Sequence, residues 1–109
     1  MRIWDIPPDK LCRQHLLGEH SELHALWNIL TQDKNGFSKH PETLRWKGKL
    51  KALFLRHEAL VLEMKTRGYK HKTPLDPLRA RGEQRQNEFV DTPEEQEEIL
   101  RKKKCGCQV

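Results

Sequence analysis

Apolar residues recur every three or four positions in two long segments, the spacing of helices with one buried face. In the first segment they are Cys12, Leu16, Leu23, Trp27 and Leu30. Two prolines hold the chain ahead of this segment extended, so we expect Asp9 to be the N-cap of a helix that ends near Leu30. The first eight residues then form an extended N-terminal arm.

The second apolar segment predicts the central core helix, from about Glu42 to Arg67, with Gly68 as its C-terminal stop. Its buried face comprises Trp46, Leu50, Leu53, Phe54, Val61 and Met64. Gly48 weakens this helix near its start, where a break can occur. A polar loop over residues 33–40 separates the two helices.

A capping box begins the third predicted helix. Thr92-Pro93-Glu94-Glu95 places a threonine three residues before a glutamate, with proline at the first helical position. The polar segment 73–91 would link this helix, over residues 92–106, to a core formed by residues 1–72. We therefore predict an all-α fold, a compact three-helix single domain over residues 1–109 with an extended N-terminal arm.

Charge and cysteine usage indicate the kind of binding partner and the cellular compartment. The net charge of +5 suits a polyanionic partner. Arg45, Lys49 and Arg56 would project from the second helix opposite its apolar face, either as a DNA-binding surface or as a solubilising one. Three cysteines make no even disulfide framework, and no apolar run is long enough to span a membrane, so we expect a cytoplasmic protein with no membrane partner.

His15 and Glu22 are seven residues apart, nearly two helical turns, so their side chains lie on one helix face. Gly18 between them would let a ligand approach the helix closely. A partly dry surface of this kind raises a carboxyl pKa towards the range useful for acid–base chemistry. On spacing alone, an ordinary solvated pair is the commoner case, and both interpretations stay open.

A set of short motifs gives evidence about function that the spacing of His15 and Glu22 does not provide. They are Arg2-Ile3, Gln14-His15-Leu16, Glu19, Glu22-Leu23, Lys49-Leu50, Phe54-Leu55-Arg56 and Lys65-x-Arg67-Gly68-Tyr69. In order and spacing, these motifs resemble the pyrimidine-dimer DNA glycosylase (phage endonuclease V) family.

The resemblance implies a chemistry. In that family the α-amino group of the first residue attacks C1′ of the damaged nucleotide and forms a Schiff base, assisted by a glutamate on the first helix. These roles fall here on Met1 and Glu22. Arg2 is bulky, so we expect Met1 to be retained, and a reference pKa of about 7.7–8.0 leaves its amine partly neutral. The implied activity is glycosidic bond cleavage with an apurinic/apyrimidinic lyase step.

The resemblance also implies a partner, damaged double-stranded DNA bound by a monomer associated with the nucleoid. Arg2 would bind a phosphate beside the lesion, Gln14 would contact the DNA, and His15 would hold the DNA or orient Glu22. The DNA-binding interpretation of Arg45, Lys49 and Arg56 then becomes the favoured one.

Two departures from the family bear on specificity. Ser21 and Ala25 stand where the family carries arginines, which removes two phosphate contacts. His20 and His24 lie nearby on the same predicted helix and can partly substitute for them when protonated.

Other residues are predicted to be structural. His57 lies in the apolar stripe as a hydrogen-bonded core histidine, and Trp4, Trp27 and Trp46 belong to the core, with Trp4 bordering the site. Cys105-x-Cys107 alone makes a poor zinc site, and we expect neither metal nor cofactor. Two other functions stay open: a catalytically silent DNA- or RNA-binding helical module, and a protein-interaction adaptor based on the C-terminal helix.

Overall fold

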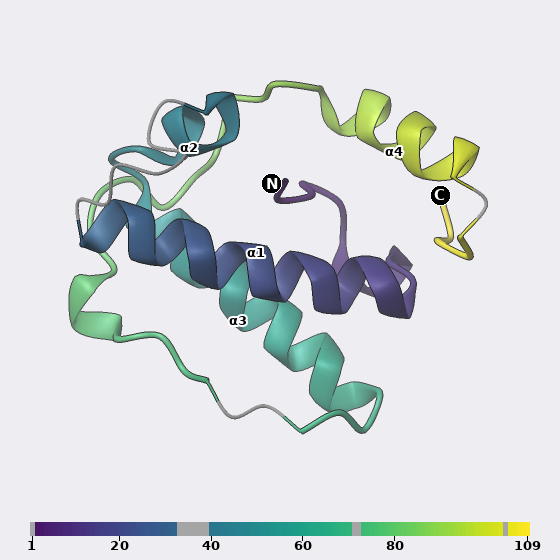
Figure 1. Ribbon diagram of the computed structural model, residues 1–109, viewed down its shortest axis with the longest axis horizontal. Helices are drawn as coiled ribbons and strands as arrows, with labels where there is room; N and C mark the ends of the chain where they lie inside the picture. Colours follow the sequence, from purple (N-terminus) through teal and green to yellow (C-terminus); the bar gives the residue numbers. More distant parts are fainter. Residues whose placement is uncertain (1, 33–39, 71–72, 104) are drawn as a thin grey trace.

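The computed structural model describes residues 2–32, 40–70, 73–103 and 105–109 (Figure 1). Its helices are η1 (Pro8–Lys10), α1 (Arg13–Thr31), α2 (Pro41–Trp46), α3 (Leu50–Thr66), η2 (Pro77–Arg79) and α4 (Pro93–Lys102). The all-α prediction is confirmed, since the sole β-type pairing within these ranges is one bridge between Lys49 and Gly82. No described helix is long and apolar enough to cross a membrane. Most of the predicted loop 33–40 lies outside the described residues.

The core forms where α1 crosses α3 (Figure 1). Its fully buried apolar side chains are Ile3, Ile6, Leu16, Leu23, Leu26, Leu53, Leu60, Leu100 and Trp46. Trp4 and Trp27 are buried as predicted, and so is His57, whose ring bonds His24 and Glu58. The N-terminal arm therefore contributes to the core although it belongs to no helix.

The first helix begins later than predicted. Asp9 lies in the 3-10 helix η1, and the chain is extended at Leu11 before α1 starts at Arg13 with Cys12 as N-cap. Leu11 is buried, so the burial of this apolar side chain accompanies the break in the helical path.

The predicted second helix is divided at Gly48 into α2 and α3. Gly48 has a φ of 74°, in the left-handed region that favours glycine. The right-handed helical path is therefore interrupted at Gly48 and begins again at Leu50. Gly68, with a φ of 84°, follows the end of α3 as predicted. The compact domain thus has four α-helices in its described part rather than the predicted three.

The segment 81–83 fills the gap that this break leaves. The carbonyls of Arg81 and Glu83 accept the N–H groups of Lys51 and Ala52 at 2.9 and 3.1 Å, which satisfies two otherwise unpaired donors in the first turn of α3. Gly82 lies so close that a Cβ added to it would be 2.1 Å from the Gly48 oxygen. The predicted linker is therefore held in place although most of it is exposed.

α4 begins with the predicted capping box. The Thr92 hydroxyl accepts the Glu95 N–H at 3.2 Å, and the Glu95 carboxylate accepts the Thr92 N–H at 3.0 Å. The helix ends at Lys102, short of the predicted residue 106. It lies across the arm from α1, so three distant parts of the chain meet around residues 2–6 (Figure 1).

Candidate active site

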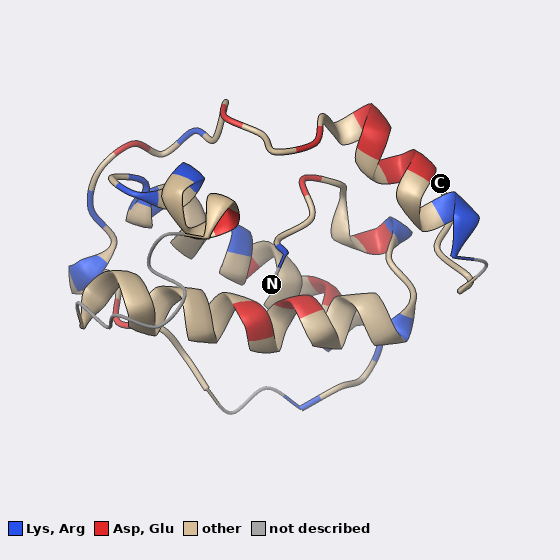
Figure 2. Ribbon diagram, turned by 45° about the horizontal axis from the view of Figure 1, so that its top comes forward, with Lys and Arg blue, Asp and Glu red and all other residues tan. Residues whose placement is uncertain are grey.

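The arm, residues 2–6, belongs to no helix, and the main-chain N–H groups of residues 2–5 are held by side chains rather than by a neighbouring strand. Arg2 N donates to Glu22 Oε2 at 2.7 Å, Ile3 N to Glu42 Oε2 at 2.8 Å, Trp4 N to Glu19 Oε1 at 3.1 Å and Asp5 N to Gln96 Oε1 at 2.6 Å. Figure 2 shows the acidic stretch of α1 beside the N-terminus. Each of these four donors has its own acceptor, which fixes the arm residue by residue.

Arg45 and Arg56 hold the other side of the arm. Arg45 donates to the Ile3 oxygen at 2.8 Å and to both oxygens of Glu42, and its side chain is 5% exposed. Arg56 donates to the Ile6 oxygen at 2.8 Å and is 14% exposed. Both arginine side chains are therefore largely buried, and their hydrogen bonds are made within the protein.

Lys49 is also buried, and its ammonium bonds Gln86, Asn87 and Glu88 at 2.8–3.2 Å. The prediction that Arg45, Lys49 and Arg56 form an open basic face for DNA is therefore wrong. Buried carboxylates need counter-charges, and Arg45 and Arg56 supply them for the acids that hold the arm. Helical spacing predicts on which face of a helix a side chain lies, but it does not predict whether another segment of the chain covers that face.

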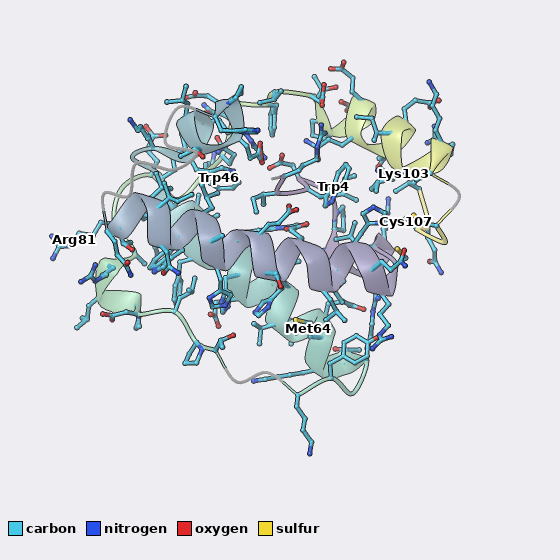
Figure 3. The ribbon with its side chains drawn as sticks, in the orientation of Figure 1. Trp4, Trp46, Met64, Arg81, Lys103 and Cys107 are labelled. Carbon is cyan, nitrogen blue, oxygen red and sulfur yellow. The ribbon has the colours of Figure 1, made fainter. Side chains whose placement is uncertain are left out.

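A cleft of about 410 Å³ lies beside the arm along the first three turns of α1. It is lined by Arg2, Trp4, Gln14, His15, Gly18, Glu19, Glu22, Ile99 and Lys103. Four residues predicted for the site, Arg2, Gln14, His15 and Glu22, thus come together. Met1 lies outside the described residues. Trp4 and Lys103 face this region from the arm and from α4 (Figure 3).

Gly18 has no side chain to project into the cleft, so the backbone of α1 is uncovered there. It lies within α1 between His15 and Glu22, it is exposed, and no atom lies within 4 Å of the position that a Cβ would occupy. The backbone of α1 is therefore open to a ligand at this point, as the sequence predicted.

Two cationic side chains, those of Arg2 and Lys103, line the cleft. The Arg2 guanidinium lies 5.0 Å from the centre of the Trp4 ring and pairs with Asp91 at 2.8 Å, with 37% of its side chain exposed. Lys103 is exposed at the end of α4. An anionic ligand in the cleft would meet positive charge from both side chains.

The two acids of the cleft differ in environment. Glu19 is almost fully buried and accepts hydrogen bonds from Arg56 and from the Trp4 N–H. Burial raises the pKa of the Glu19 carboxyl, while the Arg56 guanidinium and these hydrogen bonds act in the opposite direction. Glu22 is only half-buried. Glu22 is therefore the carboxylate that substrate can reach.

Sequence reasoning missed the residues that position the arm, namely Glu19, Glu42 and Gln96, and the two residues that α4 brings to the cleft, Ile99 and Lys103. It also misplaced His20 and His24, which group with His57 and do not line the cleft. The sequence offers one indication of these contacts. An extended arm that buries Ile3 and Trp4 without a partner strand needs other acceptors for its main-chain N–H groups, and acidic side chains can provide them.

A second cluster borders the cleft through His15. Cys12, His15, Cys105 and Cys107 bring their sulfur and ring nitrogen atoms within 4.8 Å of one another. Burial raises the pKa of the Cys107 thiol to about 12. In the sequence this cluster corresponds to two short pairs, Cys12-x-x-His15 at the start of α1 and Cys105-x-Cys107 near the C-terminus, which lie about 90 positions apart.

Comparison with known proteins identifies a family for the chain. A family model described as pyrimidine dimer DNA glycosylase matches residues 1–77. No significant match to a curated protein or to a solved structure was found. The matched segment covers the arm, α1, α2 and α3, and it includes every residue that lines the cleft except Ile99 and Lys103. The chain belongs to the pyrimidine dimer DNA glycosylase family.

Proposed function

We propose that the protein is a DNA-repair glycosylase with apurinic/apyrimidinic lyase activity, which acts on damaged double-stranded DNA through the amine of its first residue. Pyrimidine dimers are the proposed lesion. Family membership supports the substrate class. The observation that carries the mechanism is the 2.7 Å hydrogen bond from the Arg2 main-chain nitrogen to Glu22 Oε2 in the wall of an open cleft.

This hydrogen bond constrains the nucleophile through covalent geometry. The α-nitrogen of any residue is three bonds from the main-chain nitrogen of the next, a separation of at most about 4 Å. An amine on Met1 would therefore stay close to the Glu22 carboxylate whatever its own torsion angles. An α-amine also suits the task, because its reference pKa of about 7.7–8.0 leaves a neutral fraction at cellular pH.

The proposed reaction has two stages. The neutral amine attacks C1′ of the damaged nucleotide, the glycosidic bond breaks, and the departing base takes the bonding electron pair and a proton. The nitrogen lone pair then opens the sugar ring: O4′ leaves C1′ with the bonding electron pair and takes a proton from solvent, and the nitrogen, which keeps its second proton, forms a protonated C1′ iminium, the Schiff base. Glu22 stabilises this cation and removes a proton from C2′, and β-elimination expels the 3′ phosphate.

The remaining cleft residues would position DNA. Arg2 would exchange Asp91 for a phosphate, and Lys103 would contact the backbone from the opposite rim. Gln14 and His15 border the sugar site, and the low wall at Gly18 admits the deoxyribose. Entry of the sugar requires distortion of the duplex, as in other enzymes that flip a nucleotide.

Borohydride trapping tests the proposal directly. Reduction during turnover of a duplex with one cyclobutane dimer should give a covalent complex, and peptide mapping should place the DNA on residue 1. A preparation with an acetylated N-terminus should give no complex yet bind the duplex. Intact mass measured beforehand establishes which residue carries the free amine. Cleavage by the acetylated protein, or binding without any cross-link from the free amine, would contradict the mechanism and favour a silent DNA-binding module.

A further inference from the structure

We infer that Cys12, His15, Cys105 and Cys107 form a zinc site that fastens the C-terminal tail to the start of α1. From His15 Nδ1 the sulfurs of Cys12, Cys105 and Cys107 lie at 3.1, 3.3 and 3.5 Å, and the two C-terminal sulfurs are 3.4 Å apart. A tetrahedral zinc with these donors has ligand-to-ligand distances of about 3.5–3.8 Å. The side chains therefore need only small shifts to surround a metal ion.

The donor set favours zinc and a structural role. Three thiolates and one imidazole fill all four positions of a tetrahedral zinc, which leaves none for substrate or water. Sulfur-rich tetrahedral sets also exclude magnesium and calcium, which take oxygen ligands. The four ligands come from two short pairs, Cys12-x-x-His15 at the start of α1 and Cys105-x-Cys107 in the tail.

The surroundings suit the charge of such a site. Zinc with three thiolates and a neutral imidazole carries one net negative charge, and Cys12 is the N-cap of the 19-residue α1. Negative charge at a helix N-terminus is stabilised by the helix dipole. The Cys12 main-chain N–H also donates to Cys107 Sγ at 3.1 Å, a contact that stabilises a thiolate.

The tail adopts the turn that the site requires. Gly106 has a φ of 99°, which lets the chain reverse between the two cysteines. Beyond them, the Gln108 N–H donates to the Lys10 oxygen at 2.7 Å, so the tail returns to the segment before α1. Figure 3 shows Cys107 beside the first turn of α1. Both C-terminal ligands lie beyond residues 1–77, so the family match does not include them.

The site would also shape the cleft. His15 and Lys103 both line it, and zinc would fix His15 directly and Lys103 through the nearby ligand Cys105. Ligation through Nδ1 places the remaining ring proton of His15 on Nε2. This consequence for catalysis rests on the proposed function, whereas zinc binding itself does not.

Metal analysis of untagged protein, expressed with added zinc and purified without chelators, tests the inference. We expect one zinc per chain by inductively coupled plasma mass spectrometry and none in C105S/C107S, whose helical circular dichroism should stay close to wild type. The matched control is His24→Gln, which alters the separate cluster of His20, His24 and His57 and should keep its zinc.

Cobalt substitution gives a second readout. Cobalt in the proposed site should show thiolate-to-metal charge-transfer absorption in the near ultraviolet, which a histidine-only site lacks, and C105S/C107S should lose this absorption. Chelation of the zinc should increase hydrogen exchange in residues 103–109 while α1 and α3 stay protected. Protein without zinc, zinc retained by C105S/C107S, or a disulfide in place of the metal by non-reducing mass spectrometry would each overturn the inference. None of these measurements uses DNA, so their outcome is separate from that of the glycosylase proposal.

Discussion

Arg56 on α3 grips Glu19 on α1 with two hydrogen bonds, Nε to Oε2 at 2.6 Å and Nη2 to Oε1 at 2.9 Å. The Glu19 side chain has no solvent exposure and that of Arg56 has 14%. The same two residues also bind the arm, through the Trp4 N–H and the Ile6 carbonyl. One ion pair therefore joins the two largest helices to the segment that leads to the cleft.

Loss of one partner of this pair should be costly. Arg56→Met leaves the buried Glu19 carboxylate without its counter-charge, and we expect the free energy of unfolding to fall by about 3–5 kcal/mol. Urea denaturation followed by circular dichroism measures it. Arg101→Met is the matched control, because its pair with Glu98 is half-exposed on both sides and should contribute about 0–1 kcal/mol. The double variant Glu19→Leu/Arg56→Met should recover part of the loss, and equal losses for Arg56→Met and Arg101→Met would contradict a structural role for the buried pair.

Glu22→Gln separates chemistry from structure. Glutamine retains an oxygen that accepts the Arg2 N–H, so the arm should stay in place, but it cannot remove a proton. We expect the single-turnover rate of strand cleavage to fall by about 10²–10⁴-fold, with little change in affinity for dimer-containing duplex. Glu58→Gln, an exposed carboxylate on α3, serves as control and should cleave normally. A Glu22→Gln protein that cleaves at the wild-type rate would remove this residue from the mechanism.

Gly18→Ala should raise stability and lower activity together. Alanine in the middle of α1 meets no atom within 4 Å and favours the helix by about 0.5–1 kcal/mol relative to glycine. The added methyl group raises the wall of the cleft where we propose that the sugar enters. Thermal unfolding and single-turnover cleavage on the same preparation measure both effects. Unchanged cleavage in a stabilised variant would show that the substrate does not approach the helix at this point.

Gly82→Ala tests the contact that caps α3. Both Gly48 and Gly82 have positive φ, at 74° and 90°, so alanine at either position costs about 1–2 kcal/mol of backbone strain. Only at Gly82 would the new Cβ meet a backbone oxygen, at 2.1 Å. We therefore expect Gly82→Ala to lose about 1–3 kcal/mol more than Gly48→Ala in denaturant titrations. Equal losses would mean that segment 81–83 moves away without cost.

Local patterns in the sequence predicted the positions of most helices, though not all of their ends, and part of the site. Apolar spacing predicted the buried faces of α1 and α3, the Thr92–Glu95 box predicted the start of α4, and Gly48 marked the break. His15, Gly18 and Glu22 share one wall of the cleft because helical periodicity places them there. Each of these features depends on residues fewer than ten positions apart.

The features that could not be predicted join residues far apart in the chain. Lys49 is covered by residues 86–88, and Cys12 meets Cys107, contacts for which neither periodicity nor charge gives a direction. A basic residue on a polar helix face looks the same in sequence whether it meets solvent or a carboxylate. Arg45 was assigned to DNA for this reason, although Asp5 and Glu42 neutralise it inside the fold.

The ionic ties of the arm have a consequence for how the protein responds to electrolyte. The proposed phosphate contacts of Arg2 and Lys103 would be exposed, so counterions would compete with them strongly as ionic strength rises. The pairs that Arg45 and Arg56 form are shielded from dissolved ions by the surrounding protein. On the proposed function, moderate salt should thus release nucleic acid while the arm keeps its shape, so the dissociated protein should bind again as soon as the salt is diluted.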